Sequence, residues 1–91
     1  MPTGRPRGRA FEPESLAEAR ERVRNNIRRL RTERGWTQQD AANECRLGFN
    51  HYRHIEGGRA GLTLRTLCSL AEGFGVDVSE LLAPVEDEKP S

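Results

Sequence analysis

One short stretch of the chain, residues 45–58, gathers polar side chains that can read the edges of nucleic-acid bases. Four of them stand within five residues, namely Asn50, His51, Arg53 and His54. Asparagine can form paired hydrogen bonds with adenine, and arginine can do so with guanine. Histidine can donate or accept a hydrogen bond, and it gains charge below about pH 6.5. These residue types predict contacts with base edges in a DNA groove.

Each of these side chains also has a purely structural interpretation. Asn50 could cap the start of a helix, since Asn is a favoured N-cap residue. His51 and His54 could be ordinary solvent-facing residues. A zinc site at the His pair is not expected, because no third ligand stands at a suitable spacing. We therefore expect neither a metal nor another cofactor.

The composition describes one small domain with an uneven distribution of charge. The chain has 91 residues and a net charge of +1. Residues 1–34 carry ten Arg and five Glu, and residues 62–91 carry two basic and six acidic residues. A basic front and an acidic end fit a polyanionic partner. With no membrane-length apolar run and no signal-peptide pattern, the expectation is a cytoplasmic, nucleoid-associated protein.

The two ends of the chain have little to bury. Residues 1–12 are rich in Gly, Pro and Arg, and we expect them to be disordered in isolation. Their Arg5, Arg7 and Arg9 suit a narrow minor groove, and a solvated tail is an equal interpretation. Residues 84–91 are expected to form a flexible acidic tail. Elsewhere, Cys45 and Cys68 lack metal-site spacing, and both are expected as reduced core thiols.

Between these ends, residues 13–83 predict an all-α domain of five helices. The first helix starts near Pro13 and ends at Gly35, a left-handed cap residue. Its apolar stripe recurs at helical spacing and comprises Leu16, Ala19, Val23, Ile27 and Leu30. The second helix follows the N-cap Thr37, with Asp40 completing a capping box.

The third helix runs from about residue 50 to 56 and turns Tyr52 and Ile55 inward. The fourth begins at Thr63, and its buried side is expected to hold Leu64, Leu67, Leu70, Ala71 and Phe74. Gly73 within it costs about 1 kcal/mol relative to alanine, which close helix packing would explain. A short fifth helix follows Asp77. The short turn before the third helix indicates a helix-turn-helix. No catalytic set of side chains has supporting spacing, so we expect no enzyme.

Three segments carry a resemblance to a known family. They are IRRLRTERGWTQQDAANEC, HIEGGRA and TLRTLCSLAEGFGVDVSELL. Over about residues 23–82, and without insertion or deletion, they resemble the phage Cro and repressor-type (xenobiotic-response-element) helix-turn-helix domains. The resemblance implies a repressor-like domain and a transcriptional regulator that binds double-stranded DNA. Small free-standing members of the family include phage repressors, antitoxins and controllers of restriction–modification systems.

The resemblance also implies roles for individual residues. Gln38 matches a residue that holds a phosphate, and Arg59 with Thr63 matches a second phosphate clamp. Glu56 matches a position that makes an internal contact. The third helix matches the recognition helix, so base contacts are expected from Phe49, Asn50, His51, Arg53 and His54.

The family usually has glycine in the turn before this helix, where the chain has Arg46. Either Arg46 adopts the left-handed conformation at a cost of about 1–3 kcal/mol, or the turn slides to Gly48. The first is favoured, because sliding would move Tyr52 and Ile55 off the core face. Arg46 then places a cation beside the DNA backbone, and Gly48 caps the third helix. Phe49 either touches a thymine methyl or folds back as a hydrophobic staple.

A homodimer is expected, because two recognition helices about 34 Å apart can read a palindrome. Candidates for the shared surface are Leu62, Phe74, Val76, Val78 and Leu82, with the long first helix as the competing element. RNA polymerase is a further candidate partner. The rival interpretation is a protein-binding module, antitoxin-like or polymerase-contacting, with weak or no specific DNA binding. The near-neutral net charge favours this rival.

Overall fold

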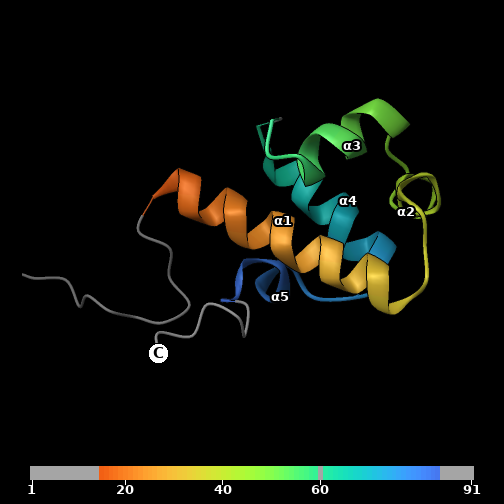
Figure 1. Ribbon diagram of the computed structural model, residues 1–91. Helices are drawn as coiled ribbons and strands as arrows, with labels where there is room; N and C mark the ends of the chain where they lie inside the picture. The colour runs from red at the N-terminus through yellow and green to blue at the C-terminus, as the bar shows by residue number, and fades with distance from the viewer. Residues whose placement is uncertain (1–14, 60, 85–91) are drawn as a thin grey trace, which may run out of the picture.

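The computed structural model describes residues 15–59 and 61–84, and this part of the chain is built entirely from helices and their connections. The elements are α1 (Leu16–Glu33), α2 (Gln38–Glu44), α3 (Phe49–Glu56), α4 (Leu64–Phe74) and α5 (Val78–Leu82). Helix α1 runs the length of the molecule, between α5 and the group formed by α2, α3 and α4 (Figure 1). The all-α prediction is confirmed. None of these helices is long and apolar enough to cross a membrane.

The predicted arm, with Arg5, Arg7 and Arg9, lies outside the described residues, as does the acidic tail from residue 85 onward. The predicted start of the first helix near Pro13 is corrected, because α1 begins at Leu16. Ser15 has an extended backbone there, and its hydroxyl accepts a hydrogen bond from the Glu18 amide at 3.0 Å, which fixes the start.

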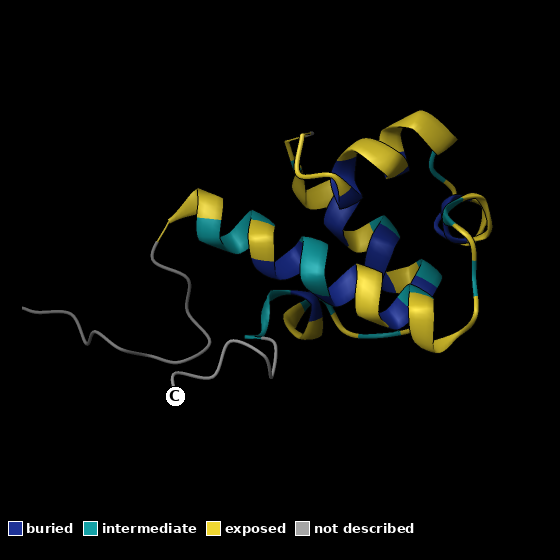
Figure 2. Ribbon diagram, in the orientation of Figure 1, coloured by how far each residue is buried: buried dark blue, intermediate teal, exposed yellow. Residues whose placement is uncertain are grey.

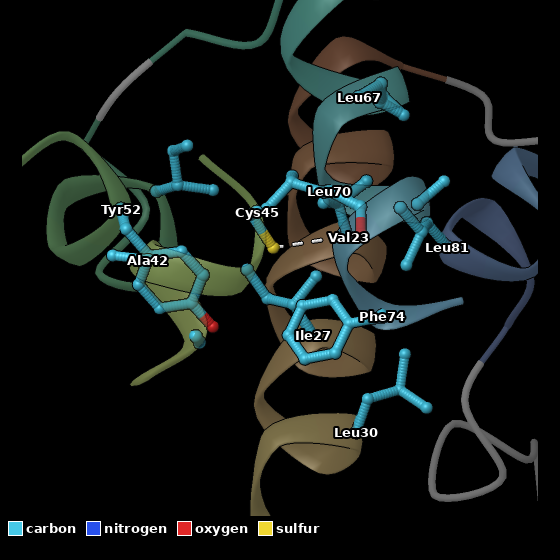
Figure 3. Close-up of a cluster of buried hydrophobic side chains, with 13 residues drawn as sticks. Val23, Ile27, Leu30, Ala42, Cys45, Tyr52, Leu67, Leu70, Phe74 and Leu81 are labelled. Atoms are coloured by element: carbon cyan, nitrogen blue, oxygen red, sulfur yellow. Dashed lines mark hydrogen bonds between the residues drawn. The ribbon is translucent and has the colours of Figure 1, made fainter. Parts of the chain in front are cut away.

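The hydrophobic core lies where α1, α4 and α5 meet the helix-turn-helix, and Figure 3 shows its side chains interlocking. Val23, Ile27 and Leu70 are fully buried in it, as their periodic spacing predicts. For two other residues in the predicted apolar stripes, the prediction of burial is wrong. Leu16 is 65% exposed and Leu64 is 76% exposed, because each is the first residue of its helix and points beyond the core.

The two cysteines are free thiols, as predicted, but only one belongs to the core. Cys45 is 2% exposed, and its thiol points toward the Leu70 carbonyl (Figure 3). Burial, with the nearby charge of Glu44 adding to it, raises the pKa of the Cys45 thiol to about 12. Cys68 lies on the exposed side of α4, so its prediction as a core residue is corrected.

Four of the connections begin with the same backbone motif. In each, a residue one or two positions past the helix has a positive φ, and the following amide donates to a carbonyl five residues earlier at 2.8–3.0 Å. The residues with positive φ are Gly35 (70°), Arg46 (58°), Gly58 (78°) and Gly75 (72°). Three of the four are glycines, the residue that adopts this conformation without strain. Arg46 is the exception.

Helices α2 and α4 approach each other closely at Gly73. A Cβ atom on Gly73 would overlap the Cys45 sulfur and lie 2.6 Å from the Cys45 Cα. The close packing expected for this glycine is therefore confirmed. The contact holds the end of α2, and with it the turn that leads into α3, against the body of the domain.

Helix α5 is attached to α1 through a buried amide that the apolar pattern did not indicate. Asn26 is 2% exposed, and its Nδ2 donates to the carbonyl oxygens of Leu81 and Ala83, both at 2.9 Å. These bonds satisfy carbonyl groups at the end of α5 that have no partner within the helix.

Candidate nucleic-acid interface

Helices α2 and α3 form a compact helix-turn-helix on one side of the domain (Figure 1). The predicted capping box is confirmed, since Thr37 and Asp40 exchange hydrogen bonds of 2.9 and 3.0 Å between side chain and backbone. Gly48 caps α3 with an extended backbone and φ of −64°, also as predicted. The chain thus enters α3 without a side-chain cap, and the first turn of α3 stays open to solvent.

Arg46 adopts the left-handed conformation, with φ of 58°, so the turn does not slide to Gly48. Its amide donates to the Asn43 carbonyl at 3.1 Å, and the Leu47 amide donates to the Ala42 carbonyl at 2.9 Å. Leu47 then packs against the core. The Arg46 side chain is exposed and has no hydrogen-bond or ion-pair partner within residues 15–59 and 61–84.

The outer face of α3 is exposed, while Tyr52 and Ile55 on its inner face are buried, as predicted (Figure 2). Asn50, His51 and His54 are all exposed. None of these three side chains makes a hydrogen bond with another described residue. Because Gly48 has replaced a side-chain cap, Asn50 is not the cap of α3. The predicted base-reading residues therefore stand together on one face with their donors and acceptors unused.

Phe49 is 38% exposed and lies outside the hydrophobic core. Its ring faces Arg53, whose guanidinium carbon is 5.7 Å from the ring centroid. The sequence allowed Phe49 either to touch a thymine methyl or to fold back as a hydrophobic staple. The position of its ring disagrees with the staple.

Glu56 is a buried acidic residue whose carboxylate is hydrogen-bonded by several side chains. The residue is only 2% exposed. It accepts hydrogen bonds from Arg31 at 2.6 and 3.2 Å, from the Tyr52 hydroxyl at 2.6 Å and from Gln38 Nε2 at 3.0 Å. Burial alone would raise the pKa of Glu56, but these hydrogen bonds outweigh it and hold the pKa below its usual value. The expected internal contact of Glu56 is confirmed, and it joins α1, α2 and α3.

The burial of Glu56 affects the charge that residues 35–61 present at the surface. The sequence gives three basic and three acidic residues there. One of the acids faces inward, since Glu56 is buried, whereas Asp40 and Glu44 are exposed. Arg46, Arg53 and Arg59 are all exposed. The outward-facing balance of this region is therefore positive, although its formal charge is zero.

The predicted phosphate contacts differ in how free their side chains are. Arg59 is exposed without a side-chain partner among the described residues. Gln38 Nε2 carries two hydrogens, and Glu56 takes one of them. The Thr63 hydroxyl caps α4 by accepting from the Thr66 amide at 3.1 Å, and it also contacts Thr66 Oγ1 at 3.0 Å. A phosphate contact at Thr63 would therefore use backbone amides rather than this hydroxyl.

The candidate dimer residues do not form one patch. Phe74 is corrected, because it is 2% exposed and stacks on Trp36 within the chain, with ring centroids 5.5 Å apart. Leu62 precedes α4 and Val76 follows it. The two residues are therefore separated by the length of α4, which is about 16 Å. Val78 and Leu82 on α5, and Val76 just before it, are half-buried and are available as a smaller surface.

The fold and this polar face define a helix-turn-helix protein of the regulator class. A family model described as a helix-turn-helix domain matches residues 22–83. The chain belongs to this family.

Two curated relatives support the same class. An uncharacterised helix-turn-helix-type transcriptional regulator of Sinorhizobium fredii is 41% identical over 73 residues, which cover 78% of this chain and 91% of the relative. The cryptic phage CTXphi transcriptional repressor of Vibrio cholerae is 38% identical over 68 residues, or 71% of this chain and 61% of the repressor. These relatives are regulators, which confirms the prediction of a non-enzymatic protein.

Two solved structures have the same architecture. A hypothetical transcription factor from Neisseria superposes with a TM-score of 0.73 at 27% identity, covering 82% of this chain and 88% of that one. A mutant of a restriction–modification controller protein gives a TM-score of 0.60 at 29% identity, covering 71% and 80%. The resemblance that the sequence motifs indicated is therefore confirmed.

Replacing Arg46 with glycine is expected to stabilise the domain by about 1–2 kcal/mol, because the left-handed conformation costs a side chain about that much. Urea unfolding measures the change. The control is Arg46→Ala, which removes the same charge but keeps a Cβ atom in the strained conformation. Equal stability of the glycine and alanine variants would contradict a cost at this turn.

Proposed function

We propose that this chain is a sequence-specific transcriptional regulator that binds a palindromic double-stranded DNA operator as a homodimer, in the cytoplasm at the nucleoid. The observation that carries the proposal is the outer face of α3. Exposed side chains that suit base edges stand there beside the cations Arg46 and Arg59. Glu56, the acidic residue of α3 itself, is turned inward and paired with Arg31.

Each residue on this face receives a role from its chemistry. Asn50, His51, Arg53, His54 and the ring of Phe49 contact base edges in the major groove. Arg46, Arg59, Gln38 and the start of α4 at Thr63 contact phosphates on either side of the groove. The strain at Arg46 supports its assignment, because a costly residue at a turn that elsewhere uses glycine indicates a function outside folding.

The proposed dimer places two α3 helices about one DNA turn apart. The apolar edge of Val76, Val78 and Leu82 supports a small shared surface, with α1 as the competing element. Sedimentation of the chain over a range of concentrations, with and without operator, tests this part. A single chain bound to each operator would refute the dimer while leaving DNA binding intact.

Selection of bound duplexes from a random-sequence pool is the experiment that tests the function. The enriched duplex is then titrated against random DNA at two salt concentrations. Enrichment of a two-fold symmetric site, bound with strong salt dependence, is the expected result. Salt-sensitive binding without enrichment would mean a nonspecific DNA protein. An absence of binding even at low salt would instead support a protein-binding module, such as an antitoxin-like or RNA-polymerase-contacting adaptor.

Two matched variants separate base reading from phosphate binding. Asn50→Ala is expected to relax base preference at one or two positions, by about 1–3 kcal/mol. Arg59→Ala is expected to weaken all DNA alike and to reduce the salt slope by about one. Both side chains are exposed and lack partners among the described residues, so neither change should unfold the domain. Arg59 is a cleaner probe than Gln38, which also supports Glu56. Equal losses on operator and random DNA for both variants would refute the two roles.

A further inference from the structure

The first turn of α3 presents an unusual pair of side chains. Phe49 is the first residue of the helix and Arg53 stands one turn later, on the same face. The guanidinium carbon of Arg53 lies over the Phe49 ring, 5.7 Å from the ring centroid. Neither residue is used by the fold, because both side chains are exposed and Phe49 lies outside the core.

Arg53 has no carboxylate partner within the described residues, so the aromatic ring is what orients it. A cation–π contact attracts the guanidinium through its charge, whereas the hydrogen bonds of a guanidinium run in its plane. The in-plane donors of Arg53 therefore stay free for the O6 and N7 acceptors of a guanine. A guanidinium that is already oriented also loses less conformational freedom on binding.

The uncovered part of the Phe49 ring offers an apolar surface beside those donors. The apolar group that a major groove presents is the C5 methyl of thymine. Neighbouring base pairs rise by about 3.4 Å along each strand. Phe49 and Arg53 lie side by side, so the ring can contact a methyl group on one base pair while the guanidinium binds a guanine of the next.

We propose that Phe49 and Arg53 act as one reader of a C5-methylated pyrimidine next to a guanine. The shared chemistry is the methyl group, which thymine carries and which 5-methylcytosine presents at the same ring position. The reader thus favours thymine beside guanine, and it also distinguishes 5-methylcytosine from cytosine. This inference rests on the proposed function, since it names the base step that α3 recognises.

The test uses duplexes that differ by a single methyl group. At the pyrimidine beside guanine in the selected operator, thymine is compared with uracil, and 5-methylcytosine with cytosine. Fluorescence anisotropy with the full chain gives the affinity ratio for each pair. Burying one methyl group is expected to give a ratio of about four-fold in each comparison.

Three protein variants assign the effect to its side chains. Phe49→Ala is expected to bring both ratios to one, whereas Phe49→Leu keeps an apolar contact and part of each ratio. Arg53→Ala is expected to lose the guanine preference at the neighbouring pair, on the order of ten-fold, and to keep the methyl ratios. Thermal unfolding checks that the variants fold, as expected for exposed positions.

The outcomes separate this inference from the function on which it rests. A symmetric operator bound with strong salt dependence, but with thymine-to-uracil ratios of one throughout, would overturn the inference alone. So would an operator without a pyrimidine–guanine neighbour pair, or ratios that persist in Phe49→Ala. Failure to bind any duplex would overturn the proposed function and the inference together.

Discussion

Replacing Glu56 with glutamine is expected to destabilise the domain by about 3–5 kcal/mol at neutral pH. The change keeps the shape of the side chain but leaves the Arg31 guanidinium without its negative partner. The hydrogen bond from the Tyr52 hydroxyl to Glu56, 2.6 Å long, is weakened as well. Small domains have about 5–15 kcal/mol of stability in total, so this single change removes a large share. Urea unfolding measures the loss.

The matched control is Glu33→Gln, which also removes an Arg–Glu ion pair. Glu33 contacts Arg29 at 3.1 Å, but both side chains are largely exposed, at 56% and 46%. An exposed pair contributes less than about 1 kcal/mol, so this control is expected to unfold almost as the parent does. Equal effects of the two substitutions would contradict the central role of the buried carboxylate.

The acid sensitivity of the Glu56 effect follows from the direction of its pKa shift. The pKa of Glu56 in the folded chain is below its ordinary value of 4.5. The unfolded chain therefore binds a proton more readily, so this contribution is complete above about pH 4.5 and is lost as the pH falls toward the folded pKa. Glutamine does not titrate. The difference between parent and Glu56→Gln is expected to narrow below pH 4.5, and a difference that widens there would refute the assigned shift.

Local patterns in the sequence were sufficient to predict the fold. Helical spacing located Val23 and Ile27 in the core. The turn position of the resembling family, with the fixed spacing from Thr37 to Ile55, predicted the left-handed conformation of Arg46. The same reasoning misplaced Leu16 and Leu64. An apolar period tells which face of a helix is buried, but it does not tell where along the helix the core ends.

Long-range contacts account for the other differences. Phe74 was predicted for a dimer surface, yet Trp36 stacks on its ring within the chain. Arg31 and Glu56 are 25 positions apart, and a single sequence contains nothing that pairs them. The candidate interface was easier to predict than these contacts, because a motif of known spacing defines the outward positions of α3, such as Asn50 and His54.

Replacing Gly73 with alanine is expected to destabilise the domain by about 1–3 kcal/mol or more, as overpacking does in a filled core. Helix propensity alone predicts the opposite, a gain of about 1 kcal/mol. The sign therefore tests whether the contact between α2 and α4 decides the outcome. A Cβ at this position would lie 2.6 Å from Cys45 Cα and 2.8 Å from its nitrogen, and backbone atoms cannot rotate away.

Gly57→Ala provides the control, because Gly57 has φ of −84° and the nearest atom to an added Cβ is 3.4 Å away. That substitution is expected to be neutral or slightly stabilising. Cys45→Ala should restore little stability to Gly73→Ala, since it removes the sulfur but leaves the backbone clash. Full rescue would show that only the side chain is in the way. With the backbone displaced, the end of α2 and the turn at Arg46 must move, so operator affinity is expected to fall even at temperatures where Gly73→Ala remains folded.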